Sequence, residues 1–333
     1  MTDLATAQDE QDDAPVHPVS RRRRAMTIIT WILVACWLLW AAGRLVGVDR
    51  ISSLSFALIP AMAVVPYVAA GVVIPLAVAA LTRNWAALAV MVTVTAVFAG
   101  IVLPRAIGGG QPHATGPRLR ILTANLRFGQ AGDQGLVDLV RRTGADVLSV
   151  QEFTPAAVDR LDQAGIEQLL PYRVIDPRSG PEGSGLYSRY PLAQLPDRGE
   201  TTFAMVNATL EVPGTSPVRL TAAHPPAPLG PDAPRWRHDI GEIPPATPHG
   251  QVGIVAGDFN ASLDHAPLRR LIGEGFTDAA EATGQGLVPT FRPWPPITID
   301  HVLADKRCAI QRVKIYYQPG SDHRALFTQL RLP

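Results

Sequence analysis

The stretch VGIVAGDFNAS, residues 252–262, decides the fold of the C-terminal two-thirds of the chain. Its first half is apolar and rich in β-branched residues, which is typical of a buried strand. Its second half turns abruptly polar at Asp258 and Asn260. Functional groups suit such a position, because a rigid strand there meets an accessible loop. The stretch therefore predicts a sheet whose strand ends carry a functional site.

The same pattern recurs along the chain from residue 118 onward. The other strand-like runs are RLRILTANL (118–126), ADVLSVQE (145–152), SGLYS (184–188), FAMVNATLEV (203–212), VRLTAAH (218–224), TIDHVLA (298–304), RVKIYY (312–317) and ALFTQLRL (325–332). Helices are predicted over 135–142, 155–164 and 264–272. Strands outnumber helices and most connections are short, which predicts a layered α+β domain and not a doubly wound parallel sheet.

Polar residues stand at or just beyond the ends of these runs. They are Asn125, Glu152, His224, Asp258, Asn260, Asp300, Asp322 and His323. Carboxylates and carboxamides next to apolar runs are costly to bury unless they are paired or bound to a metal. Oxygen-rich ligand sets without cysteine suit hard cations better than zinc. The pattern therefore predicts a site for Mg²⁺, with Mn²⁺ as the second candidate.

The N-terminal third has the composition of a membrane anchor. The basic run Arg21–Arg24 is followed by three apolar stretches without a charged residue: Met26–Gly43, Leu54–Leu81 and Trp85–Leu103. The first alone could be a signal peptide, but a cleaved signal does not explain the other two. A helix of about 20 residues crosses the hydrocarbon core of a bilayer. We therefore expect three transmembrane helices over residues 26–103, the second of them kinked by its prolines.

The positive charges indicate an orientation. Arg83, between the second and third stretches, would lie on the same side as Arg21–Arg24, and this side is cytoplasmic by the positive-inside tendency. A polar and basic tail over 1–25 then lies in the cytoplasm. After three spans and a Gly- and Pro-rich linker over 104–116, the domain over 117–333 lies outside the cytoplasm. If one stretch is re-entrant or interfacial, the domain lies inside instead.

The charge of the C-terminal domain bears on its partners. Residues 117–333 hold 22 lysines and arginines against 23 aspartates and glutamates, which gives a net charge of −1. A sequence-independent nucleic-acid binder usually carries a basic excess that displaces counterions from phosphates. Nucleic acid is therefore not the favoured partner, and the sequence identifies no protein partner. A disulfide is not expected, because Cys36 lies in an apolar run and Cys308 in the domain.

Seven short motifs carry a resemblance to a known family. In chain order they are TANLRFG (123–129), VQEF (150–153), SGLYSRYPL (184–192), AAHPP (222–226), AGDFNAS (256–262), IDHVLA (299–304) and SDHRALF (321–327). Over about 118–331 the chain resembles the endonuclease/exonuclease/phosphatase superfamily, which includes DNase I, abasic-site endonucleases, sphingomyelinases and inositol-polyphosphate phosphatases. The resemblance implies a DNase I-like four-layer α/β sandwich and metal-dependent cleavage of phosphate esters.

The resemblance also implies a metal site. Glu152 matches the principal Mg²⁺ ligand of the family, Asn125 the residue that supports it, and Asp322 a further metal-site carboxylate. Taken alone, Asn125 could instead cap a turn.

The catalytic residues follow from the same motifs. Asp258 and Asn260 match the pair that orients and deprotonates the attacking water and contacts the scissile phosphate. Asp300 matches the carboxylate that orients the catalytic histidine, here His323, and His224 matches a second phosphate-contacting position. Without the resemblance, Asp258 and Asn260 could be Asx-turn residues, and His224 a satisfied histidine before a Pro-Pro loop.

Other polar and aromatic residues have weaker claims on the site. His301 directly follows Asp300 and would point to the opposite face of a strand, which favours a structural role. Arg189 could contact a phosphate or pair inside the domain. The remaining histidines are expected at the surface: His113, His238, His249 and His265. Three aromatic residues near the site could contact substrate or bilayer, or pack internally: Trp236, Phe291 and Trp294.

These observations predict a membrane-anchored, Mg²⁺-dependent phosphoesterase. A three-helix anchor before this domain resembles the membrane-bound VanJ-type branch of the superfamily from actinobacteria. That resemblance implies a lipid-linked phosphate or pyrophosphate as substrate, at the outer face of the cell membrane. Two alternatives stay open. One is an outward-facing DNA or RNA nuclease, and the other is a non-catalytic membrane module that binds phosphorylated ligands.

Overall fold

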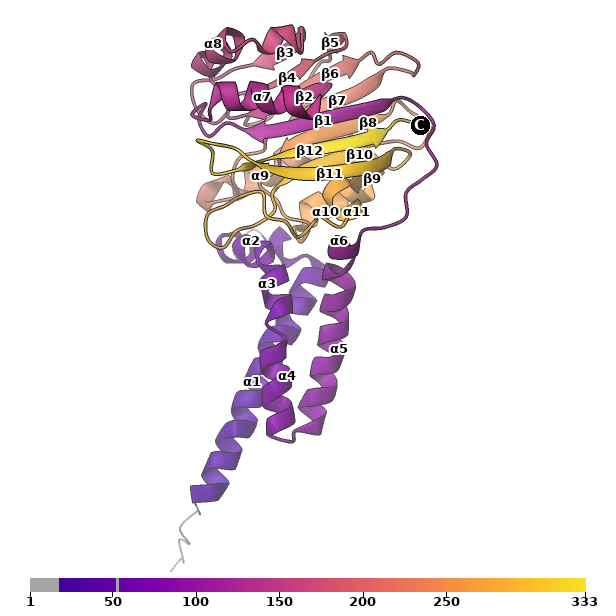
Figure 1. The fold of residues 1–333 in the computed structure, drawn as a ribbon. Coiled ribbons are helices and arrows are strands. Elements are labelled where there is room, and N and C mark those ends of the chain that lie inside the picture. The colour runs from indigo at the N-terminus through magenta and orange to yellow at the C-terminus, as the bar shows by residue number, and fades with distance from the viewer. Residues whose placement is uncertain (1–17, 52–53) are drawn as a thin grey trace, which may run out of the picture.

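A computed structural model describes residues 18–51 and 54–333 of the chain. It shows a bundle of helices that carries a two-sheet domain at one end (Figure 1). The predicted polar tail over 1–25 lies outside the described residues for positions 1–17. From position 18 the chain is already helical, so that Arg21–Arg24 belong to the first helix and not to a separate tail.

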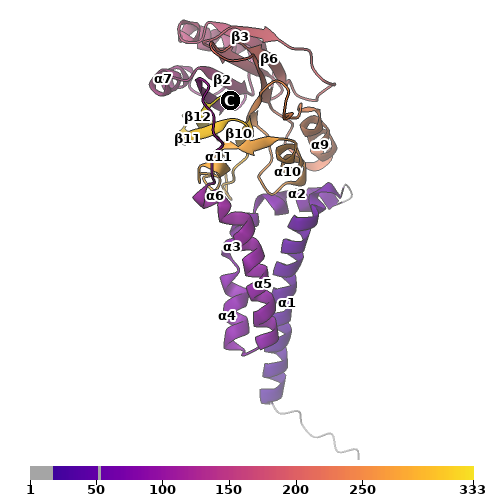
Figure 2. The same ribbon diagram turned by 90° about the vertical axis from the view of Figure 1, so that its right-hand side faces the viewer.

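Three columns of helix run side by side in the bundle (Figures 1 and 2). They are α1 (Pro18–Val46), α3 with α4 (Val65–Ala70 and Val73–Leu81), and α5 (Trp85–Val102). Two segments are long and apolar enough to cross a membrane, Arg21–Val46 and Trp85–Ile107. The tight hairpin predicted between α4 and α5 is present. Its Arg83 has a positive φ of 51°, and the Asn84 side chain caps α5 by accepting from the Ala87 backbone N–H.

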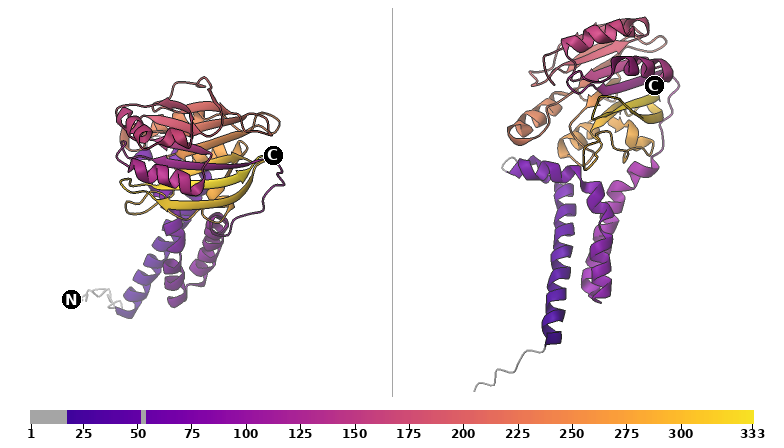
Figure 3. Two further views of the ribbon diagram at one scale, coloured as in Figure 1. Left: turned by 45° about the horizontal axis from the view of Figure 1, so that its top comes forward. Right: turned by 60° about the vertical axis from the view of Figure 1, so that its left-hand side comes forward.

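The second predicted span is broken. Helix α2 (Ser55–Ala63) meets the α3–α4 column at an angle of 60° and lies beneath the two-sheet domain (Figure 3, right). Pro66 explains the break, since proline starts a helix readily but clashes with the backbone of a preceding turn. Two helices qualify as spans, or three if the bent pair counts as one. The structure therefore supports a membrane-type helical bundle but does not fix three crossings.

The C-terminal domain contains two six-stranded sheets. In the first the strand order is β11 (Ala309–Tyr317), β12 (Arg324–Arg331), β1 (Arg118–Asn125), β2 (Val147–Gln151), β4 (Ser184–Ser188) and β3 (Tyr172–Asp176). In the second it is β5 (Leu192–Gln194), β6 (Val206–Leu210), β7 (Val218–Ala223), β8 (Gly253–Asp258), β10 (Asp300–Asp305) and β9 (Phe276–Asp278). Within each sheet one central pair is parallel, β1 with β2 and β7 with β8, and the other pairs are antiparallel.

The two sheets pack face to face, with helices on their outer faces (Figure 1). Helices α7 (Asp133–Thr143) and α8 (Pro155–Gln163) bury one apolar side against the first sheet. Helices α9 (Ala233–Glu242) and α10 (Ala266–Gly273) do the same on the second, beside the short α11 (Ala279–Ala282). The strands alternate with turns and bury apolar side chains on both faces, as expected for inner layers. The predicted α/β sandwich of two sheets is confirmed.

The predicted linker over 104–116 is not wholly a flexible tether. Its first residues form a short helix, α6 (Pro104–Ile107), and Arg105 is only 3% exposed. Both Nη atoms of Arg105 donate to the carboxylate of Asp264 in the domain, at 2.6 and 2.7 Å. The segment reads as a linker because of its glycines and prolines, yet a buried arginine must pair with an acid. That pairing holds the two-sheet domain directly on the bundle.

Candidate active site

Strand register brings the predicted polar residues to one end of the sandwich. In the first sheet, β1 and β2 are parallel, so Asn125 at the end of β1 lies next to Glu152, which directly follows β2. In the second sheet, Asp258 at the end of β8 pairs with Asp300 at the start of the antiparallel β10. The site therefore takes side chains from facing ends of both sheets, which is why residues far apart in sequence converge.

Asn125 joins the two sheets. Its Nδ2 donates to Glu152 Oε1 and to Asp258 Oδ2, both at 3.0 Å, so the two carboxylates lie on either side of one amide nitrogen. Its Oδ1 accepts from the backbone N–H of Arg127 at 2.8 Å and thereby fixes the amide orientation. Asn125 is fully buried. A side chain that only capped a turn would not bridge two carboxylates.

Glu152 sits on a strained backbone. Its φ is 53°, in the left-handed region that non-glycine residues seldom adopt. Oε2 accepts from the backbone N–H of Phe128 at 2.7 Å, which leaves further lone pairs on both oxygens for a cation. Burial raises the pKa of Glu152, and the hydrogen bonds from Asn125 and Phe128 oppose that shift. A bound cation would relieve the cost of keeping this carboxylate charged.

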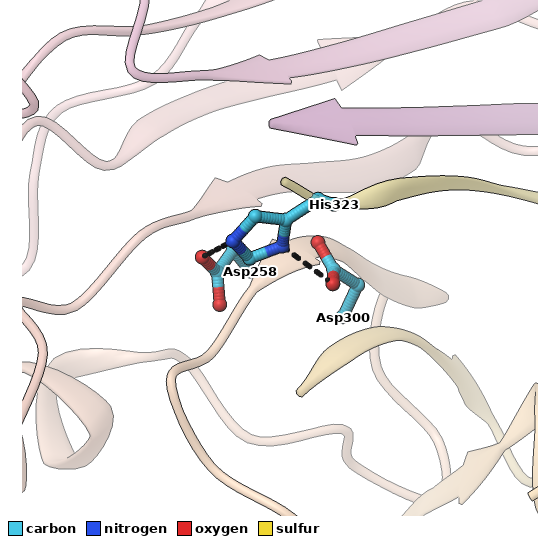
Figure 4. Close-up of side chains that lie close together, drawn as sticks. All are labelled: Asp258, Asp300 and His323. Carbon is cyan, nitrogen blue, oxygen red and sulfur yellow. Dashed lines mark hydrogen bonds and ion pairs between the residues drawn. The ribbon is translucent and has the colours of Figure 1, made fainter. Parts of the chain in front are cut away.

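His323 lies between two aspartates (Figure 4). Its Nδ1 is 2.9 Å from Asp300 Oδ2, and its Nε2 is 3.6 Å from Asp258 Oδ2. All three side chains are buried. Burial alone would lower the pKa of His323, but the negative charges of Asp300 and Asp258 outweigh it and raise that pKa to about 10. The ring is therefore held as an imidazolium whose Nε2–H faces Asp258.

Asp258 is the most strongly perturbed carboxylate of the cluster. Burial raises its pKa to about 7, against the opposing charge of His323. Its Oδ1 accepts from the backbone N–H of Asn260 at 2.8 Å, which is an Asx-turn bond. Asn260 has a φ of 47°, and its Nδ2 donates to the carbonyl of Pro225 at 3.1 Å. Asp258 and Asn260 thus form an Asx turn and also belong to the site, because the turn orients the Asp258 carboxylate toward His323.

His224 completes this side of the cluster as a neutral group. Its Nε2 is 3.9 Å from Asp258 Oδ2, and its ring packs on Phe203 with centroids 5.1 Å apart. Burial and the charge of His323 lower the pKa of His224 to about 3. A neutral imidazole can offer one N–H to a phosphate oxygen without adding charge to the site.

The donor set fits a hard divalent cation. Asp258, Asp300 and His323 each offer a ligand atom, and these atoms lie within 4.8 Å of one another. Nδ1 of His323 is already bonded to Asp300, so the three residues form a row of ion-paired side chains and not an open ring of ligands. We call this row, Asp258–His323–Asp300, the relay. Glu152 offers its carboxylate oxygens beside Asp258, and Asn125 orients both carboxylates through its Nδ2. Oδ1 of Asp300 is buried without a hydrogen-bond partner among the described residues, as expected where a ligand or water belongs.

Asp322 stands apart from the buried cluster. Its side chain is a third exposed, and its Oδ1 is 3.9 Å from Nε of Arg127. It is close enough for its negative charge to act on the pKa of Glu152. The structure thus places Asp322 at the rim of the site, where its charge acts on the pKa values of both Glu152 and His323.

Three further residues support the site, and two of them, Ser321 and Thr290, were not predicted. Ser321 Oγ donates to the Asn125 carbonyl at 2.9 Å and accepts from the His323 backbone N–H at 3.0 Å. Thr290 Oγ1 accepts from the backbone N–H of Asp300 at 3.0 Å. Phe291 stacks beside the His323 ring with centroids 5.0 Å apart. The serine directly before the Asp322–His323 pair was a usable signal for Ser321. Phe291 was expected near the site, with its contact open, whereas nothing in the sequence indicated a role for the Thr290 hydroxyl.

Two residues of open role lie outside the site. His301 points to the opposite face of β10, where Nδ1 bonds Asp278 Oδ2 and Nε2 bonds the Ala261 carbonyl, both at 2.8 Å. Arg189 follows β4, which is antiparallel to β2, so it lies at the far end of the sheet from Glu152. There its Nε is 3.6 Å from Asp146 Oδ1. Both roles are structural.

Surface placement was wrong for one of the four leftover histidines. His265 is buried: Nδ1 accepts from the Ser262 backbone N–H at 2.8 Å, and Nε2 bonds the Ile59 carbonyl of α2. The sequence does not reveal this burial, because the Ile59 carbonyl that bonds Nε2 comes from the bundle, more than 200 positions away. Among the aromatic residues, Trp236 packs fully inside and donates to the Phe259 carbonyl, whereas Trp294 is 88% exposed.

The sequence profile of the Endonuclease/Exonuclease/phosphatase family matches residues 122–323, which span both sheets and the whole cluster. The chain belongs to this family. A search among curated proteins finds no match. Family members include nucleases, phosphatases and sphingomyelinases, whose shared reaction is hydrolysis of phosphate esters.

Solved structures share the fold at low sequence identity. TDP2 of D. rerio, humanized by 14 mutations, is 16% identical, with a TM-score of 0.50 over 65% of this chain and 99% of that one. D. rerio TDP2 complexed with a single-strand DNA product is 15% identical, again with a TM-score of 0.50 and with the same coverage. An endonuclease/exonuclease/phosphatase from Beutenbergia cavernae DSM 12333 is 16% identical, with a TM-score of 0.49 over 65% of this chain and 72% of that one. The matched part corresponds in size to the two-sheet domain.

Proposed function

We propose that the chain is a membrane-anchored phosphohydrolase that uses a divalent cation, Mg²⁺ first, to cleave a phosphate ester or anhydride. The observation that carries the proposal is the buried Asp258–His323–Asp300 relay, joined through Asn125 to Glu152. Buried like charges are expensive to hold together, so such a cluster indicates a functional site.

Glu152 would hold the cation, with Asn125 supporting its carboxylate and Asp322 at the rim. When bound, the cation neutralises charge on the phosphoryl oxygens. The chain's own residues supply the remaining requirements. His323 holds a proton at Nε2 and so presents a positive N–H to the phosphate. His224 and Asn260 lie beside Asp258 to orient the phosphate.

Asp258 is the base in this proposal. Its pKa of about 7 allows it to accept a proton from water near neutral pH. The water oxygen forms a bond to phosphorus, its proton passes to the Asp258 carboxylate, and the P–O bond to the leaving group breaks. The leaving oxygen keeps the electron pair of that bond. A phosphate leaving group carries this charge without a proton, which favours a pyrophosphate over an alkyl ester.

The bundle supports a membrane-bound substrate. Helices α1 and α5 are long and apolar enough to cross a membrane, and Arg105 holds the domain against their ends. A site so close to the bilayer meets lipid-linked phosphates first, as the VanJ-type layout also implies. A nuclease would use the same cluster, but the domain carries no basic excess to hold a polyanion.

The test uses the full-length protein in lipid nanodiscs. Phosphate release from a polyprenyl pyrophosphate, hydrolysis of a short water-soluble phosphate ester and nicking of plasmid DNA are measured with Mg²⁺ and with chelator. We expect metal-dependent turnover of the lipid, reduced at least 1,000-fold by Asp258→Asn and at least 100-fold by His323→Gln, as general acid–base groups contribute about 10²–10⁴. A matched control is His238→Gln, an exposed histidine bonded to the Glu200 carbonyl.

Turnover that persists in chelator, or in both site variants, would contradict the mechanism. Rapid DNA nicking without lipid hydrolysis would favour the nuclease. Metal-dependent binding of the lipid without turnover of any of the three substrates would favour the non-catalytic module.

A further inference from the structure

A cavity lies where the helical bundle meets the two-sheet domain. Its volume is about 500 Å³, within the range of about 300–1,000 Å³ that is typical of ligand pockets. Helices α3 and α5 form one wall, together with Ala63 at the end of α2. Three segments of the domain form the other wall: 262–264, 286–289 and 296–298.

The walls of the cavity are almost entirely apolar. Phe98 and Val102 of α5 and Leu103 directly after it line the cavity, and Leu287 and Ile297 line it from the domain. An apolar cavity stays dry in water and accepts apolar ligands. The occupant that fits these walls is therefore a hydrocarbon group.

Two charged residues lie at the end of the cavity next to the domain. Arg105 and Asp264 form the buried ion pair described above. The Nε–H of Arg105 is buried and has no acceptor within the described part of the chain. A ligand oxygen at this end would satisfy it, which suits an amphiphile whose polar end faces the domain.

The cavity shares its wall with the candidate active site. Ser262 in the wall is two positions after Asn260, and Thr298 is two positions before Asp300. A short ladder of β-bridges connects the cavity wall to the site. Phe291 pairs with Ile297 of the wall and also with His323. A ligand in the cavity therefore lies on the other side of this ladder from the catalytic histidine.

Part of the cavity wall belongs to a helix that is long and apolar enough to cross a membrane. Phe98 and Thr95 line the cavity and belong to Trp85–Ile107, one of the segments apolar enough to span a bilayer. At the domain end, the Tyr67 hydroxyl of α3 donates to the Pro296 carbonyl at 2.6 Å, and the exposed Trp294 is two residues away. Tyrosine and tryptophan are enriched at membrane interfaces. The opening would thus be reached by chains from within the bilayer.

Resting on the proposed function, we infer that this cavity binds the hydrocarbon chain of the substrate, a membrane lipid with one long chain ending in phosphate or pyrophosphate. The chain lies between α3 and α5, and the phosphate group extends past the Phe291 ladder to the relay at His323. The protein would then select substrates by chain length, because only a long chain fills the cavity from the membrane side.

The first test compares two substitutions on the same helix. Ala99 lines the cavity, whereas Ala96 is exposed and does not line it. Full-length protein in nanodiscs is assayed with a long-chain lipid pyrophosphate and with a short-chain, water-soluble analogue. We expect Ala99→Trp to reduce turnover of the long-chain substrate at least tenfold and that of the short one less than twofold, with Ala96→Trp leaving both unchanged. Leu287→Trp fills the cavity from the domain side and repeats the test if Ala99→Trp folds poorly.

The second test reads binding without turnover. A long-chain lipid phosphate with a diazirine in the chain is photolysed on the full-length protein in chelator, and labelled peptides are identified by mass spectrometry. We expect label within 95–103 and 286–298, lost in Ala99→Trp and kept in Ala96→Trp. The same chain without phosphate is expected to label these peptides at least fivefold less.

The outcomes separate the two proposals. Label in the cavity without turnover of any phosphate substrate would refute the proposed function and keep the lipid site. Three results would overturn the cavity inference even if the enzyme is active: label elsewhere, equal label by the phosphate-free chain, which would mean bulk bilayer lipid, or equal effects of Ala99→Trp on both chain lengths.

Discussion

Asp300 shows how much of the candidate chemistry depends on a single residue. Its Oδ2 holds Nδ1 of His323, its backbone N–H is held by Thr290, and its charge keeps His323 protonated. The proposed base, Asp258, titrates near 7, and His323 near 10. Activity that needs the first deprotonated and the second protonated rises with pH through about 7 and falls above about 10.

Asp300→Asn tests this arrangement. Loss of the carboxylate removes the charge that raises the His323 pKa, so His323 loses its proton at a lower pH. We expect the alkaline limb of the kcat/KM profile to move at least one pH unit toward neutral, with the acid limb of Asp258 displaced less. We also expect kcat to fall about 100-fold or more, as for loss of an orienting group. A lower rate with an unmoved alkaline limb would contradict this role.

His301, on the opposite face of β10 from Asp300, has a structural role that a substitution can test. Burial lowers its pKa, but the Asp278 charge outweighs burial and raises it above the usual value of 6.5. A raised pKa contributes stability that is present in full below the unfolded-state pKa and is lost as pH rises through the folded-state pKa. We expect His301→Gln to lower the free energy of unfolding by about 3 kcal/mol near pH 6, with a smaller loss at high pH. Equal losses in chemical denaturation at both pH values would contradict the charged pair.

At this scale the sequence predicts the residues of the cluster but not their supports. Asp258 and Glu152 were predicted because polar residues at the ends of apolar strands leave a clear pattern. Thr290 was not, because a threonine in a loop looks the same whether its hydroxyl binds water or the backbone of a catalytic strand. The motif groups Asp322 with the metal ligands. Its position at the rim, 3.9 Å from Nε of Arg127, depends on a contact that the sequence does not show.

At the scale of elements, the composition of the chain does not reveal that the helical bundle contacts the two-sheet domain directly. Asp264 accepts from Arg105 of α6 and, at 2.5 Å, from Arg44 at the end of α1. Asp49, from the turn after α1, accepts from the backbone N–H of Ala266 at the start of α10. These bonds fix the segment that directly follows Asn260. The bundle therefore holds the segment that follows the candidate base Asp258.

Asp264→Asn is expected to loosen this junction. Removal of one partner from a buried ion pair costs about 3–5 kcal/mol, because the remaining charges are left buried. We expect a clear fall in the melting temperature of the full-length protein and faster proteolysis after residue 107. Asp232→Asn is the matched control, since Asp232 pairs with Arg235 at the surface and such pairs contribute less than about 1 kcal/mol. Equal melting temperatures for the two variants would contradict the role of the junction.

Two of the elements that the sequence missed have a composition that is atypical of a strand or a helix. Strand β3 (Tyr172–Asp176) is an exposed edge strand with arginine and aspartate, so it lacks the apolar pattern of the inner strands. Helix α9 lies in a Pro-rich stretch, although its Pro234 stands in the first turn, where proline is tolerated. The break between α2 and α3 was expected only as a kink. Whether a proline kinks a helix or ends it depends on what the freed segment can pack against, here the underside of the domain.

For the whole molecule, orientation in the membrane follows from where the charges lie along the bundle. The hairpin with Arg83 and the N-terminal part of α1 lie at the same end, opposite the domain (Figure 1). Thr82 beside that hairpin is 3.5 Å from Thr30 of α1, between hydroxyl oxygens, so the two basic regions share one side. By the positive-inside tendency we predict that this side is cytoplasmic and that the two-sheet domain lies on the opposite face.

Reporter fusions test this orientation in cells. A reporter active only outside the cytoplasm, fused after Pro333, is expected to be active, whereas one active only inside is expected to be silent there. The pattern should reverse for fusions at Arg83, which serve as the matched control because that position lies at the other end of the same bundle. If α2–α4 fail to cross and only α1 and α5 do, Arg83 lies outside and Pro333 inside, so the signals of both fusions are exchanged. A cytoplasmic signal after Pro333 would contradict the outward domain and remove outer-leaflet lipids from the possible substrates.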